Sequence, residues 1–142
     1  MLFRSFLHMG VEPYNFVSAL NGVIAQRLVR VLCAQCAAPY RPEAKELAAS
    51  RLTDQAIEDF AFRIGHGCKE CHGTGYKGRR AIAEVLLLDD EIREQIIAQA
   101  SIRRIKEAAR AKGTRFLRDS ALDLVRQGIT TLEEINRVTF VG

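Results

Sequence analysis

The segment "GCKECHGTGYKGRRAIAEVLLL", residues 67–88, joins a pair of cysteines to a run of apolar residues. Two residues between cysteines let one tight turn present both sulfurs to a single metal ion, and the flanking glycines supply backbone that can adopt positive φ. The run at 79–88 follows Gly78, is rich in apolar residues and ends in acidic ones, a pattern typical of a strand between turns. The segment therefore predicts a metal-binding turn that leads into a strand.

The four cysteines of the chain form two such pairs, with the overall spacing C-x2-C-x31-C-x2-C. Two CxxC turns complete the four-coordinate thiolate shell that structural zinc prefers. Two disulfides would need an oxidising compartment, and a thioredoxin-like redox pair would leave the other pair unused. We therefore expect structural Zn²⁺ on Cys33, Cys36, Cys68 and Cys71. With four thiolates present, we expect His66 and His72 to lie beside the site or on the surface.

A second apolar run, "GVIAQRLVRVL" at residues 22–32, precedes the first cysteine pair. If both runs are strands, the simplest arrangement pairs them antiparallel and places the metal-binding segment at the tip of the hairpin. Both runs are apolar on more than one face, so helix is the alternative. Between the cysteine pairs, Pro42 as a first helical residue and Thr53 as an N-cap predict two short helices, so a helical excursion is expected there.

The rest of the chain has the pattern of short helices with recognisable caps. Asp89 or Asp90, Ser101 and Thr131 are candidate N-caps, and Glu134 would complete a capping box with Thr131. The helices are expected at 91–100, 102–112, 116–127 and 132–138, and two further ones at 2–10 and 15–20. The fold class is therefore mixed α/β: a two-stranded hairpin that carries a metal module, followed by a small helical cluster.

Composition limits the function classes. With 142 residues, 48% apolar and 27% charged, the chain is expected to fold as a globular domain, and no apolar run reaches the length of a membrane span. The net charge of +4 permits anionic partners without requiring them. The basic run at 103–118 contains one aromatic, Phe116, which the helix pattern uses for packing, so a solvated helical face is expected rather than a surface on which bases stack.

Catalytic patterns are missing from the sequence. The chain has no Gly-Lys dipeptide and hence no G-x-x-x-x-G-K-[ST] loop to hold phosphates. No Ser/His/Asp or Cys/His set suggests itself, and a closed tetrathiolate site does not activate water. We expect no independent catalysis.

The ordered motifs resemble a known family. The series "MGVEPYNFVSALNGVIAQRLVRVLC", "CHGTGYKGRRAIAEVLLLDDEIREQI" and "GTRFLRDSALDLVRQGITTLEEINRVT" is similar to the C-terminal region of type II secretion and type IV pilus assembly ATPases, from about Leu2 to Thr139. The resemblance implies the end of a RecA-like ATPase core at 1–32, a tetracysteine zinc module at 33–78, a returning core strand at 79–88 and a helical subdomain at 89–142. It also implies that the four cysteines bind zinc.

Further expectations follow from the resemblance. Gln26, Arg27 and Arg30 occupy a run shared across the superfamily and would lie near a subunit or nucleotide interface, or serve a structural role. Members are cytoplasmic homohexamers that use ATP and Mg²⁺, drive extension of a pilus or pseudopilus, and associate with the inner membrane through platform proteins.

The resemblance covers the part of these ATPases that follows the phosphate-binding loop, the acidic metal-binding motifs and the histidine motif. We therefore expect an ATPase as the parent protein, of which this chain resembles the last third or so, and no ATP hydrolysis by this chain alone. An excised fragment, a truncated or split gene product and a miscalled start at Met1 would all look the same in the residues.

Two other classes are weighed. A free-standing zinc-binding adaptor or nucleic-acid-binding protein would keep the metal site and use the basic helix. A DnaJ-like chaperone would repeat the unit CxxCxGxG, which residues 68–75 match; "CAQCAAPY" at 33–40 lacks both glycines, so the chaperone is disfavoured.

Overall fold

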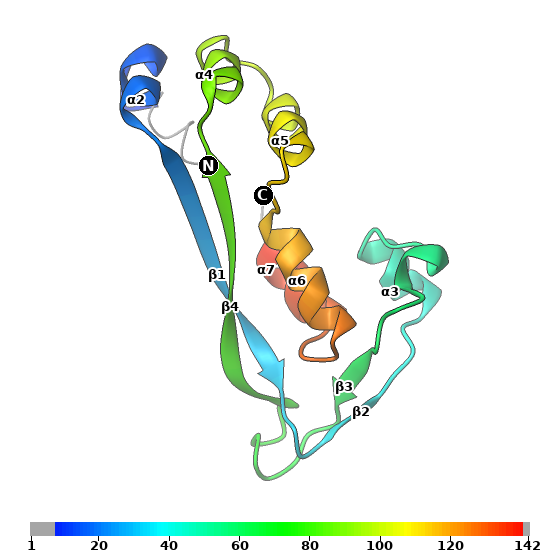
Figure 1. Ribbon diagram of the computed structural model, residues 1–142. Helices are drawn as coiled ribbons and strands as arrows, with labels where there is room; N and C mark the ends of the chain where they lie inside the picture. Colours follow the sequence, from blue (N-terminus) through cyan, green and yellow to red (C-terminus); the bar gives the residue numbers. More distant parts are fainter. Residues whose placement is uncertain (1–7, 141–142) are drawn as a thin grey trace. The chain divides into compact units, whose positions relative to one another are not determined.

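The computed structural model describes residues 8–140 (Figure 1). Two long strands, β1 (Gly22–Leu32) and β4 (Tyr76–Leu87), pair with each other. The pair is antiparallel, because the Leu88 N–H donates to the Asn21 carbonyl near one end (3.0 Å) and the Cys33 N–H donates to the Gly75 carbonyl at the other (2.9 Å). The predicted hairpin is confirmed, and the helical alternative for both runs is wrong. β4 begins three residues before the predicted start.

The excursion between the two cysteine pairs contains a second, smaller sheet. Its strands β2 (Ala37–Pro39) and β3 (Arg63–Gly65) are antiparallel, with Ala37 opposite Gly65. Beyond them lie α3 (Ala44–Ala49) and the 3-10 turn η1 (Asp54–Ile57). The predicted role of Pro42 is wrong, because α3 has Glu43 at its N-cap position. Thr53 does lie at the N-cap position of η1, but its side chain makes no cap. The predicted second helix is a single 3-10 turn, since Phe60 and Phe62 instead pack against the core of buried residues.

The predicted C-terminal helices are present as α4 (Asp90–Ile97), α5 (Ile102–Ala111), α6 (Leu117–Arg126) and α7 (Leu132–Thr139). Their caps follow local sequence: Asp89, Ser101 and Thr131 each accept a hydrogen bond from the main-chain N–H three residues on. Phe116 is the N-cap residue of α6, and its N–H donates to the Asp119 carboxylate (2.8 Å). The helix expected at 15–20 is α2 (Pro13–Ala19), whereas the one expected at 2–10 lies largely outside the described residues.

By their contacts, the described residues fall into two units that share the long strand pair. The first consists of the described part of Met1–Ala25 with Glu84–Arg115. In this unit α2 packs on α4, and α4 packs on α5. The Arg93 guanidinium on α4 donates to the carbonyls of Val17 (3.3 Å) and Leu20 (2.9 Å) and so ties down the end of α2.

The second unit consists of Gln26–Ala83 with the described part of Phe116–Gly142. One apolar cluster fills it, formed by side chains from the long strands, the excursion, α6 and α7: Val29, Leu47, Ile82, Ala121, Leu124, Val125, Leu132 and Ile135. The cysteines belong to this unit, so its packing positions the candidate site.

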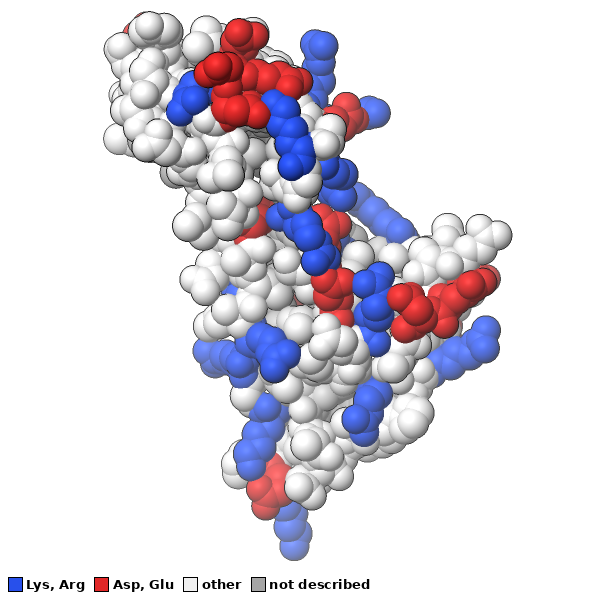
Figure 2. All heavy atoms as spheres, in the orientation of Figure 1, with Lys and Arg blue, Asp and Glu red and all other residues white. Residues whose placement is uncertain are grey.

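The basic run at 103–118 is interspersed with acidic neighbours. Arg103 pairs with Glu107 (2.9 Å), and the Lys112 ammonium pairs with Asp89 and Glu91. Figure 2 likewise shows acidic and basic side chains next to one another around the α4 end of the molecule. No helix within residues 8–140 combines the length and hydropathy required to cross a bilayer.

Candidate metal centre

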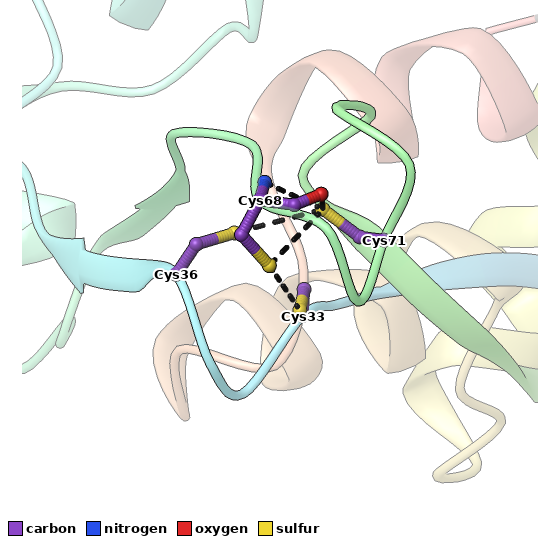
Figure 3. A group of neighbouring side chains, drawn as sticks. All are labelled: Cys33, Cys36, Cys68 and Cys71. Carbon is purple, nitrogen blue, oxygen red and sulfur yellow. Dashed lines mark hydrogen bonds between the residues drawn. The ribbon is translucent and has the colours of Figure 1, made fainter.

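The four cysteines of the two CxxC turns meet at the end of the long strand pair (Figure 3). Cys33 directly follows β1 and Cys36 directly precedes β2; Cys68 and Cys71 lie in the turn between β3 and β4. Within the first turn the Ala37 N–H donates to the Cys33 carbonyl (2.9 Å), and within the second the Gly73 N–H donates to the Cys68 carbonyl (2.9 Å). The first bond spans four residues and the second five, so each turn is closed by a main-chain hydrogen bond around its two cysteines.

The sulfur positions fit tetrahedral coordination of one metal ion. All four Sγ atoms lie within 4.8 Å of one another. Three of the separations are 3.7 Å (Cys33 to Cys68), 3.8 Å (Cys36 to Cys71) and 3.7 Å (Cys68 to Cys71). Four thiolates around Zn²⁺ at about 2.3 Å would form a tetrahedron with edges of about 3.8 Å. The cluster therefore has the donor type and spacing for one zinc ion, and offers none of the oxygen ligands that Mg²⁺ or Ca²⁺ prefers.

Main-chain N–H groups point at one of the sulfurs. Those of Cys68 and Gly75 both donate to Cys71 Sγ, at 3.2 Å each. Burial is the largest influence on the pKa of Cys71 and raises it. The two main-chain bonds, together with bonds from the thiols of Cys68 and Cys36, outweigh burial and lower the pKa overall. Burial raises the pKa of Cys36, and its thiol neighbours add to that rise. The cluster thus favours the thiolate at Cys71, the form that binds metal.

Two glycines allow the main chain at the end of β3 to approach the main chain just before β4 closely, beside the cysteine cluster. A Cβ at Gly65 would collide with the main chain of Gly75, and a Cβ at Gly75 would lie 2.6 Å from the Gly65 carbonyl oxygen. Gly75 also has a φ of +80°, which disfavours other residues. Sequence reasoning missed Gly65: the only signal was its position two residues before the flanking glycine of the second pair.

Neither His66 nor His72 belongs to the cluster of possible metal ligands found among the described residues, which contains cysteines only. His66 lies just after β3, where its N–H donates to the Cys36 carbonyl (3.3 Å), and His72 lies in the second turn with a φ of +53°.

Arg30 is engaged in the packing of α7. Its N–H and its Nε donate to the two carboxylate oxygens of the fully buried Glu134, at 2.9 and 3.0 Å, and its guanidinium stacks on the Tyr76 ring at 4.2 Å. Arg137 also binds Glu134 (2.6 Å). The Glu134 carboxylate therefore does not complete the predicted capping box with Thr131, because two guanidiniums are stronger partners than one main-chain N–H.

The other two residues of that run are exposed. Arg27 Nη1 donates to the Gln26 carbonyl (3.2 Å), and both side chains lie on the surface of β1. The structure thus separates Gln26 and Arg27, which are available to a partner, from Arg30, whose guanidinium is occupied within the chain.

Comparison with known proteins identifies relatives of the chain. The family model described as "Type II/IV secretion system protein" matches residues 2–137. The type IV pilus assembly ATPase PilB of Thermus thermophilus is 49% identical over 89% of this chain and 14% of its own length. The type II secretion system ATPase E of Vibrio cholerae is 44% identical over 92% of this chain and 25% of its length. The type II secretion system protein E of Pseudomonas aeruginosa is 42% identical over 92% of this chain and 26% of its own length. The chain therefore spans about a quarter or less of these relatives.

Proposed function

The chain belongs to the type II/IV secretion system protein family, and from this premise we propose that it is the C-terminal portion of an ATPase that powers protein secretion or pilus assembly. The observation that carries the proposal is the tetrathiolate cluster at the end of a two-stranded hairpin, in a chain that the family model matches almost throughout. The named relatives include both pilus assembly and secretion ATPases, so the proposal covers both machines.

In this proposal the chain has a structural role. Residues 1–32 and 79–88 end a RecA-like core, residues 33–78 form the zinc module and residues 89–142 form the helical subdomain. A four-cysteine zinc site has no open position, so the ion would hold the module together and would not take part in ATP hydrolysis. ATP and Mg²⁺ would bind in the remainder of the ATPase, and this chain alone would not hydrolyse ATP.

The partners in this proposal are the remainder of the ATPase, the neighbouring subunits of a homohexamer and platform proteins of the inner membrane, at whose cytoplasmic face it would work. The exposed Gln26 and Arg27 are the candidates for contact with a subunit or with nucleotide. Nucleic acid is not a proposed partner, since two residues of the basic run, Arg103 and Lys112, form ion pairs within the chain.

Two measurements test the proposal. The purified chain should contain one zinc per molecule, its thiols should react with a thiol reagent only after chelation, and it should show no ATP turnover. A chimera of the Vibrio cholerae ATPase, in which this chain replaces the matching segment, should retain ATP hydrolysis and lose most of it on Cys71→Ser. A chain without zinc would contradict the metal site, and an inactive chimera that still binds zinc would contradict the ATPase role.

A further inference from the structure

The excursion between the cysteine pairs covers one side of the α6 and α7 helices. Leu47 is buried in the same cluster as Leu124 and Leu132, and four more apolar side chains of the excursion pack against it: Leu52, Ile57, Phe60 and Phe62. If the excursion moved away, these faces of α6 and α7 would be exposed to water, which is unfavourable in proportion to the apolar area uncovered.

Polar contacts fix the same interface at three points. The Ala61 N–H donates to the Arg126 carbonyl at the end of α6 (2.9 Å). Arg118 on α6 donates to the Ser50 carbonyl at the end of α3 (2.8 Å), and Asn136 on α7 donates to the Ser50 hydroxyl (2.9 Å). Ser50 is buried, so without these partners its polar atoms would be left unpaired.

Only two short strands connect the helical part of the excursion to the cysteine turns. These strands, β2 and β3, have three residues each. A two-stranded pair of that length is at most marginally stable by itself. The cysteine cluster lies directly at its base, where Ala37 pairs with Gly65 and the Cys36 carbonyl accepts from His66. An ion that joins all four sulfurs would therefore fix the register of β2 with β3.

We infer that metal binding at the four cysteines controls the docking of the excursion on α6 and α7, through the β2–β3 pair and Ser50. The inference rests on the zinc site proposed above. Without the ion, the excursion loses its fixed base and α6 and α7 lose the surface that covers them. Because linkage is reciprocal, zinc binding and docking of the excursion favour each other by the same factor, so weakening the contact of Ser50 with the helices also weakens zinc binding.

Hydrogen exchange of the full chain tests this, with and without a zinc chelator under reducing conditions. Chelation should raise exchange in residues 33–75 and, by about tenfold or more, in α6 and α7. The α4 helix belongs to the other unit and provides the internal reference. If exchange rises in 33–75 alone while one zinc per chain is measured before chelation, the link is wrong and the zinc site stands. If no zinc binds, both proposals fail.

A variant keeps the test independent of the ligands. Arg118→Met keeps the apolar stem and removes the donors to Ser50, Asn136 and Thr139. This variant should still bind one zinc, but more weakly in competition with a chelator. Chelation should then raise hydrogen exchange in α6 and α7 several-fold less than in the wild type. Arg104→Met on α5 is the matched control, because Arg104 is exposed and lies in the other unit, and it should leave both quantities unchanged. Equal behaviour of the two variants would overturn the inference.

Discussion

The carboxylate of Glu134 holds Arg30, 104 residues earlier in the chain, by both its main chain and its guanidinium. Glu134 is fully buried, whereas the Arg30 side chain is 42% exposed. The buried charge is therefore balanced by cations that remain partly in water. This contact joins the C-terminal part of β1 to α7 within the unit that contains the cysteines.

Removing the Glu134 carboxylate should destabilise this unit. We expect Glu134→Ala to lower the free energy of unfolding by about 2–4 kcal/mol, because the Arg30 N–H and two guanidiniums lose their acceptor. Glu134→Gln keeps one oxygen for that N–H and should cost about half as much. Urea unfolding of the zinc-loaded chain measures both. The neighbouring Glu133 is exposed, so Glu133→Ala is the control, expected within about 0.5 kcal/mol of the wild type; a similar loss in all three variants would contradict this role.

The same contact predicts a pH dependence. Burial is the largest influence on the pKa of Glu134 and raises it, but hydrogen bonds from Arg137 and Arg30 lower the pKa from its ordinary 4.5 to about 2. Because the folded-state pKa is the lower one, the ionised carboxylate stabilises the fold above about pH 4.5, and this contribution is lost as the pH falls toward about 2. The difference in unfolding free energy between the wild type and Glu134→Gln should therefore shrink over that interval. A difference that is independent of pH there would show that the carboxylate is not the stabilising group.

Each cysteine should be required for tight zinc binding. Cys71→Ser replaces one thiolate by a neutral hydroxyl, a poor zinc ligand, and shortens the acceptor of two main-chain N–H groups, so we expect zinc affinity to fall by about 100-fold or more, the upper end of the effect of altering a partner of a metal ligand. Competition with a coloured chelator measures the affinity. His72→Asn, which keeps a residue tolerant of positive φ, should change the affinity less than threefold or so. A large loss in this variant would identify His72 as a ligand.

The close approach of Gly65 to Gly75 gives a prediction about backbone. Gly65→Ala forces a methyl group against the Gly75 main chain and should push the end of β3 away from the segment just before β4, lowering zinc affinity by about tenfold, the effect expected when groups that orient the ligands are displaced. Gly73→Ala is the control, because the space around a Cβ there is open and only its positive φ is strained, at a cost of about 1 kcal/mol. Chelator competition and thermal unfolding compare the two. Equal losses would mean that the close approach is unimportant.

Features set by neighbours in sequence could be predicted. The N-caps at Asp89, Ser101 and Thr131 each bind an N–H three residues away, and each CxxC pair forms its own turn, so both depend on side-chain chemistry within a few residues. The pairing of the two strand runs could be predicted because an antiparallel pair is the simplest arrangement of two such runs. Local reasoning failed at Thr53, where a helix pattern yields one 3-10 turn because the following aromatic residues are drawn into the core.

The sequence by itself thus determined the two long strands outside the cysteine pairs, the helix starts in the C-terminal part and the family, since each follows from residue types at short, fixed spacing. Only the tertiary structure decided which distant groups meet. Glu134 binds Arg30 in place of the Thr131 N–H, Gly65 faces Gly75, and Arg118 and Asn136 bind Ser50. These partners lie ten or more residues apart, and separate parts of the packing bring them together: α7 against β1 for Glu134 and Arg30, and the excursion against α6 and α7 for Ser50. No short-range pattern records that packing, because a buried polar group can be satisfied by any donor that the fold places beside it.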